Sequence, residues 1–74
     1  MKTLAQELYN ALSLKYQAEI TDAKARLRIY FENSVGIGEH PQHLEEMDKL
    51  LEIIAGAEDK KSSLERHFEI HAKI

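Results

Sequence analysis

A short break near the middle of the 74-residue chain most constrains how it can fold. The segment Ser34-Val35-Gly36-Ile37-Gly38-Glu39-His40-Pro41 holds two of the three glycines and the only proline. It separates two long segments rich in strong helix formers. Glycine favours the end of a helix, and proline fits the first turn of a new one. We therefore predict one all-α domain over residues 1–74, with helices over residues 3–34 and 41–72 joined by a turn over residues 35–40.

Apolar residues follow both predicted helices with helical spacing. In the first helix the line is Leu8, Leu12, Tyr16, Ile20, Ala23, Leu27 and Tyr30. In the second it is Leu44, Met47, Leu50, Leu51, Ile54, Ala57, Leu64, Phe68 and Ala72. Folding back at the glycines pairs residues whose numbers sum to about 75, so that large apolar side chains meet throughout. The sequence thus predicts an antiparallel two-helix hairpin.

The first helix carries a second apolar face. Leu4, Ala11, Ala18 and Ala25 recur every seven residues, with Leu14 and Ile29 beside them. These alanines either let another helix approach closely or merely reflect high helix propensity. A hairpin alone leaves this face in water, although each large side chain contributes roughly 1.5–3 kcal/mol when fully buried. We therefore expect a homodimer that forms a four-helix bundle, with this face at or near the interface; a higher oligomer or a different partner protein are the alternatives.

The sequence also predicts structural roles for three single residues. Thr3 is placed to cap the first helix. Gly56 lies inside the second helix, where it costs about 1 kcal/mol relative to alanine. It either marks a weak point or permits a close helix crossing, and we favour the crossing. Lys61 occupies a position in the apolar line, so its aliphatic stem is expected along the core with the ammonium reaching out.

The residues that could carry chemistry do not form a recognisable site. The chain has no cysteine. His67 and His71 have the four-residue spacing of zinc ligands but lack the metalloprotease pattern, and surface histidines are the expected interpretation. Glu39, His40 and His43 could bind a metal only if another chain contributed a ligand. With no phosphate-binding loop and no nucleophile beside an evident base, we expect neither an enzyme nor a cofactor.

Charge and hydropathy exclude further classes. The net charge is −3, and Lys and Arg are interspersed with Asp and Glu. A nucleic-acid surface requires a basic stripe instead. No apolar run approaches the ~20 residues that cross a bilayer. The N-terminus turns polar too soon for a signal peptide, so we expect a cytoplasmic protein.

The turn and the second helix resemble a group of small proteins encoded by tailed bacteriophages, especially marine and cyanobacterial T4-like ones. The specific part is Val35-Gly36-Ile37-Gly38-Glu39-His40-Pro41. The less specific part is the acidic helix that follows, with Ala57-Glu58-Asp59-Lys60 and Leu64-Glu65-Arg66-His67-Phe68. The resemblance covers about half of the chain. It implies a phage origin and residence in the infected-cell cytoplasm or in virions. Because the group has no assigned activity, it implies no role for any residue.

The sequence therefore predicts a non-enzymatic interaction or assembly module that pairs with itself and presents its turn to an unidentified protein. Glu39 and His40 could contact that partner, or could simply specify the turn. The alternative is a small regulator that binds a host or phage nucleic-acid enzyme through the turn and the charged helix faces. The candidate contact residues are Leu4, Ala11, Leu14, Ala18, Ala25, Ile29, Glu39 and His40.

Overall fold

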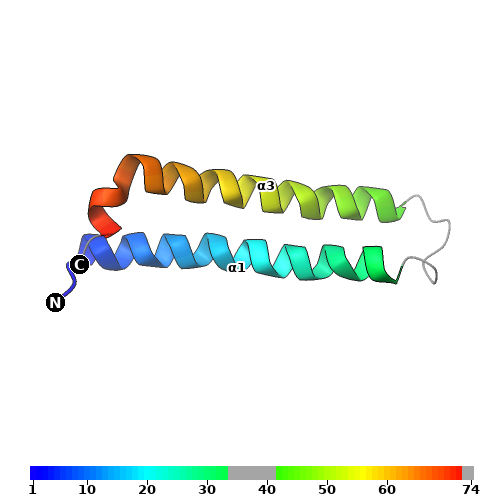
Figure 1. The fold of residues 1–74 in the computed structure, drawn as a ribbon, viewed down its shortest axis with the longest axis horizontal. Coiled ribbons are helices and arrows are strands. Elements are labelled where there is room, and N and C mark those ends of the chain that lie inside the picture. Colours follow the sequence, from blue (N-terminus) through cyan, green and yellow to red (C-terminus); the bar gives the residue numbers. More distant parts are fainter. Residues whose placement is uncertain (34–41, 73–74) are drawn as a thin grey trace.

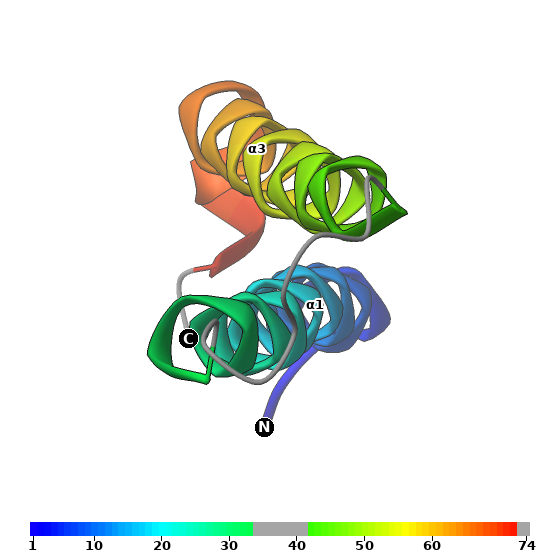
Figure 2. The ribbon, with the colours of Figure 1, turned by 90° about the vertical axis from the view of Figure 1, so that its right-hand side faces the viewer.

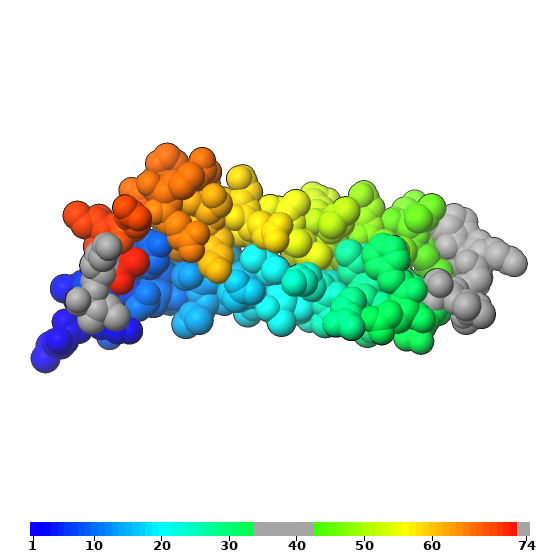
Figure 3. Space-filling view, in the orientation of Figure 1, coloured from blue at the N-terminus to red at the C-terminus, as the bar shows by residue number. Residues whose placement is uncertain are grey.

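The computed structural model of this chain describes residues 1–33 and 42–72. Helix α1 (Leu4–Glu32) and helix α3 (Gln42–Phe68) run antiparallel, side by side, and the 3₁₀ helix η1 (Glu69–Ala72) returns toward the start of α1 (Figures 1 and 2). The molecule is a narrow rod of 53 × 20 × 13 Å, along which the side chains of the two helices meet (Figure 3). The predicted all-α hairpin is confirmed. The interpretations of the turn at residues 34–41 lie outside the described residues.

The start of α1 is fixed by a capping box. The Gln6 N–H donates to the Thr3 hydroxyl at 3.1 Å, and the Thr3 N–H donates to the Gln6 side-chain oxygen at 2.8 Å. Two donors that the helix itself leaves without partners are thereby satisfied. At the other end, the Asn33 N–H donates to the Ile29 carbonyl at 2.9 Å. Thr3 is thus the N-cap that the sequence predicts.

The contact between α1 and α3 follows one unbroken repeat of seven residues, in which steps of three and four alternate. This is the pattern of a coiled-coil seam. The side chains along it are buried or half-buried. On α1 the seam is Gln6, Tyr9, Ser13, Tyr16, Ile20, Ala23, Leu27 and Tyr30; on α3 it is His43, Met47, Leu50, Ile54, Ala57, Lys61 and Leu64.

Four contacts fix how the two helices are aligned. The Tyr30 hydroxyl donates to the Glu46 carboxylate, and the rings of Tyr30 and His43 lie 5.6 Å apart. The Lys61 ammonium donates to the Gln17 side-chain oxygen at 2.9 Å. The Lys60 ammonium lies 5.9 Å from the centre of the Tyr16 ring. The residue numbers in these pairs sum to between 73 and 78, so the predicted alignment is confirmed.

The core is a single thin layer between the helices. Its centre consists of Ile20 and Ala23 from α1 and Ile54 and Ala57 from α3. Tyr16, Leu27 and Leu50 pack against this cluster. Among the described residues, no large side chain is fully buried. Two helices therefore contact each other along their length without enclosing a core.

The prediction that Leu8 and Leu12 belong to the line between the helices is wrong. Tyr9 and Ser13 take the seam positions in those turns, and the exposed fractions of Leu8 and Leu12 are 58% and 40%. The predicted line runs in steps of four through this part of α1. Each such step advances about 40° beyond a full turn, so the line leaves the seam before it reaches the N-terminus.

The sequence suggested a close helix crossing at Gly56, but α1 and α3 do not cross closely there. Gly56 is exposed, and a Cβ atom added to it would meet nothing within 4 Å. α3 continues through it without a break.

Lys61 does behave as predicted, because its side chain is half-buried in the seam while its ammonium reaches Gln17. Over the described residues, neither helix contains an apolar stretch long enough to cross a membrane.

Candidate interaction surface

One flank of the hairpin carries three hollows in a row, which we call together the groove. The terminal hollow, of about 340 Å³, is lined by Ala5, Leu8, Tyr9, Leu12, Leu64, Phe68 and His71. The central hollow, of about 530 Å³, is lined by Glu19, Lys49, Glu52, Ile53, Gly56, Ala57 and Lys60. The turn-end hollow, of about 470 Å³, is lined by Arg26, Ile29, Tyr30, Glu46, Lys49 and Leu50.

Residue spacing places the three hollows on the same flank. Each helix contributes to successive hollows a series of residues spaced by seven, and such residues lie on one side of a helix in a coiled coil. On α1 the series is Ala5, Leu12, Glu19 and Arg26; on α3 it is Glu46, Ile53 and Lys60. Both series lie directly beside the seam. The groove therefore follows the line where the two helices meet.

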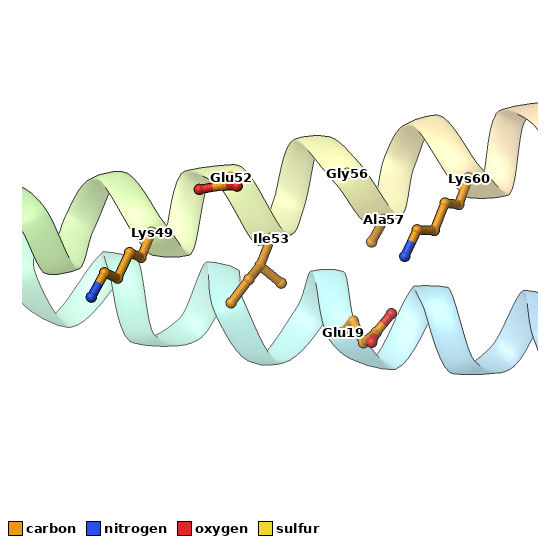
Figure 4. Close-up of a pocket in the computed structure, with 7 residues that line it drawn as sticks. All are labelled: Glu19, Lys49, Glu52, Ile53, Gly56, Ala57 and Lys60. Carbon is orange, nitrogen blue, oxygen red and sulfur yellow. The ribbon is translucent and has the colours of Figure 1, made fainter.

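The central hollow includes two small residues of α3, Gly56 and Ala57, in its lining. Figure 4 shows Ile53, Ala57 and Lys60 extending from α3 toward α1, and Glu19 rising from α1 toward them. Figure 4 labels Gly56 between Ile53 and Lys60 on α3. Because Gly56 has no side chain and an added Cβ would meet nothing within 4 Å, it leaves a notch beside these two residues. Another helix could therefore approach the α3 backbone closely at this point.

Large apolar side chains lie exposed in all three hollows. Their exposed fractions range from 40% to 58%. They come from both helices: Leu8, Leu12 and Ile29 from α1, and Ile53 and Phe68 from α3. The predicted proximity of Phe68 to Leu8 and of Leu64 to Leu12 is confirmed, because these four side chains line one hollow. They surround open space there instead of filling it.

The charged side chains of the groove balance. Three are acidic and three are basic: Glu19, Glu46 and Glu52, with Arg26, Lys49 and Lys60. Two of them also form ion pairs along α1, Lys15–Glu19 at 3.1 Å and Asp22–Arg26 at 3.0 Å. Exposed pairs of this kind contribute little to folding stability. Their effect here is to fix where each charge stands on the edge of the groove.

The opposite flank differs over most of its length. Its hollow, of about 340 Å³, is bridged by the Lys61–Gln17 hydrogen bond. That hollow is lined by Gln17, Ile20, Lys24, Glu58, Lys61, Ser62 and Glu65. Among the described residues that border the seam on this flank, the large apolar side chains that are exposed are Phe31, Leu44 and Leu51, which continue the same seven-residue series toward the turn. Within residues 1–33 and 42–72, the groove is therefore the flank whose exposed apolar side chains extend along the length of the two helices.

The predicted contact residues of α1 are all exposed, and all except Ile29 lie away from the groove. They are Leu4, Ala11, Leu14, Ala18, Ala25 and Ile29. Among them, Ile29 alone lines the groove. Glu39 and His40 lie outside the described residues. Sequence reasoning placed Leu8, Leu12 and Phe68 between the helices; a strict seven-residue repeat, extended back from Ala23, would have set the two leucines beside the seam.

Two tyrosines in the seam have raised pKa values. Burial raises the pKa of Tyr9, and the negative charges of Glu65 and Glu69 raise it further. The hydrogen bond to Glu46 raises the pKa of Tyr30, with smaller contributions from burial and from the Glu46 charge. In both cases the neutral phenol is favoured in the folded chain. At neutral pH both tyrosines therefore act as packing groups, and Tyr30 also donates its hydrogen bond to Glu46.

The predicted alternatives with metal ligands find no support in the described residues. His67 and His71 are exposed. Over residues 1–33 and 42–72, no group of three or more histidine and carboxylate side chains is arranged to hold a metal ion.

Comparison of the sequence with protein-family models, with curated proteins and with solved structures finds no match.

Proposed function

We propose that this chain is a non-enzymatic interaction module that assembles by pairing with a second copy, so that two hairpins form a four-helix bundle. The observation that supports this proposal is that the chain exposes more surface than a compact monomer of the same mass. The chain exposes 5959 Å², whereas a compact monomer of this mass exposes about 4,650 Å². Its radius of gyration is 16.4 Å, compared with about 11 Å for a compact domain of this length.

The excess has the size of a protein interface. It amounts to about 1,300 Å² for each chain, and a standard interface buries about 800 Å² for each partner. A twofold pairing of hairpins would cover it and enclose the thin core between two layers of helices. The surplus is therefore large enough for one stable homodimer interface.

The exposed surface is also apolar enough to drive association. Among the residues that the structure describes, twelve large hydrophobic residues are exposed, which is more than the five hydrophobic residues of the core. Full burial of each such side chain contributes roughly 1.5–3 kcal/mol. Burying several of them can exceed the loss of translational and rotational freedom on pairing, about 4–15 kcal/mol. A second hairpin provides apolar side chains in equal number.

One observation from the sequence bears on where the module acts, and one from the structure bears on the kind of partner it binds. The segment at residues 33–41 resembles phage proteins, which supports a role in an infected cell or in a virion. The groove itself is lined by aliphatic side chains between mixed charges, which suits a protein partner and not a nucleic acid. The module would then serve assembly, with its charged outer faces left in water.

Sedimentation velocity over a wide range of chain concentrations tests this proposal. We expect the mass to rise toward twice the 8.5 kDa of one chain, with the helical content retained or increased. A mass of one chain at every concentration would refute self-association. The regulator that binds a nucleic-acid enzyme would then become the leading interpretation.

A further inference from the structure

We infer that the second copy binds in the groove, and not on the alanine-rich side of α1; this inference rests on the proposed self-association. The groove is the place where exposed apolar side chains of both helices converge. Leu8 and Leu12 come to it from α1, and Ile53 and Phe68 from α3. A copy seated there extends the seam that already joins the helices, so each helix gains a second apolar neighbour, as a four-helix bundle requires.

Gly56 provides an independent indication. A glycine inside a helix costs about 1 kcal/mol relative to alanine. Within its own chain nothing compensates for this cost, because an added Cβ would have open space around it. The residue lies in the central hollow, beside Ile53 and Ala57. A helix of another chain that approaches the α3 backbone at this notch gives the glycine a function that the single hairpin does not.

The charges of the groove favour a copy of the same chain over a partner of one sign. In a twofold interface the same patch faces itself, so it must be self-complementary. A patch with a net charge would repel its own copy. The groove carries equal numbers of acidic and basic side chains, spread over the central and turn-end hollows. Its terminal hollow is almost entirely aliphatic and aromatic.

The alanine-rich side of α1 offers less apolar area for a second copy to bury. It belongs to one helix, and three of its seven-residue positions are alanines, which bury little area. A copy packed there would leave Ile53 in water on both chains. The groove is therefore the surface whose burial removes more apolar area from water.

Four lysine substitutions test the choice of surface, in two matched pairs. On α3, Ile53→Lys places a charge in the groove, while Leu51→Lys places it two residues away on the opposite flank; the parent side chains are 48% and 54% exposed. On α1, Leu8→Lys lies in the groove and Leu14→Lys on the alanine-rich side, with parents 58% and 70% exposed. Each variant changes the net charge by the same amount.

The measurement is the dimer dissociation constant from sedimentation equilibrium, with far-UV circular dichroism to verify helical content. We expect each groove variant to raise the constant about thirtyfold or more, as for a buried interface anchor, and each control to change it less than about threefold. If Ile53→Lys does not fold, the second groove variant, Leu8→Lys in the terminal hollow, still tests the inference.

Two results would overturn the inference while leaving self-association intact. One is a dissociation constant that rises more for Leu14→Lys than for either groove variant. The other is a constant that both groove variants leave within about threefold of the parent value. A parent chain that never dimerises fails the proposed function itself, which the same sedimentation data reveal separately.

Discussion

Adjacent isoleucines on α3 provide the sharpest test of the seam. Ile54 lies in the central cluster with Ile20 and Ala23 and is 8% exposed, whereas Ile53 lines the groove and is 48% exposed. The same substitution, isoleucine to alanine, removes the same atoms at both positions. The two variants therefore differ only in how much of the removed side chain was in contact with protein.

The expected magnitudes follow from burial. Replacing Ile54 by alanine removes three carbon atoms from the core, worth about 2.4 kcal/mol in transfer free energy. The cavity left behind adds to this loss, and the total should stay in the lower half of the range of about 2–5 kcal/mol for such core substitutions, because the thin core can close partly. Replacing Ile53 removes atoms that are already half in water, so the loss is about 1 kcal/mol. Small domains have little stability to lose, and Ile54→Ala therefore consumes a large share of it.

Urea unfolding followed by far-UV circular dichroism measures both losses. At chain concentrations low enough for the monomer, Ile54→Ala should cost at least twice as much as Ile53→Ala. At high concentration the loss for Ile53→Ala should grow, because a dimer contact adds stability by mass action. Equal losses at low concentration would refute the assignment of the seam.

Three further predictions concern single contacts. Thr3→Ala should lower the unfolding free energy by about 1 kcal/mol, since it removes the hydroxyl that caps Gln6; an unchanged urea midpoint would show that the cap does not matter. Gly56→Ala should raise the unfolding free energy of the monomer by up to about 1 kcal/mol, because its Cβ meets nothing; a lowered melting temperature at low concentration would contradict this. The pKa values of Tyr9 and Tyr30 are raised, so the unfolded chain loses its phenolic protons first. The contribution of these two tyrosines to the unfolding free energy should therefore be fully present below their ordinary pKa of 10.0 and be lost as the pH rises above it; Tyr30→Phe should reduce that loss in an alkaline unfolding series.

Much of the fold follows from local signals. Thr3 and Gln6 stand at the spacing of a capping box, and the first helix contains no glycine or proline after them. Gly36, Gly38 and Pro41 interrupt an otherwise helical chain. The alignment of the helices also follows, because only a sum near 75 brings the large apolar residues of both segments together.

The residues that line the groove could not be predicted from the sequence alone. Leu8 and Tyr9 are both apolar and adjacent, so periodicity alone cannot say which one faces α3 and which one faces water. A line of steps of four and a line of alternating threes and fours share Tyr16, Ile20 and Ala23, and they diverge only toward the N-terminus. The choice between them depends on how α1 twists around its partner.

The sequence by itself determined that two helices form, where α1 begins and how the two run together, because helix propensity, capping and spacing act within a few residues. Only the tertiary structure decided that Leu8, Leu12, Ile53 and Phe68 line one groove and that Gly56 faces open space within it. Those properties depend on the rotation of each helix about its axis. That rotation is set by the packing of side chains from both helices at once, which no single segment specifies.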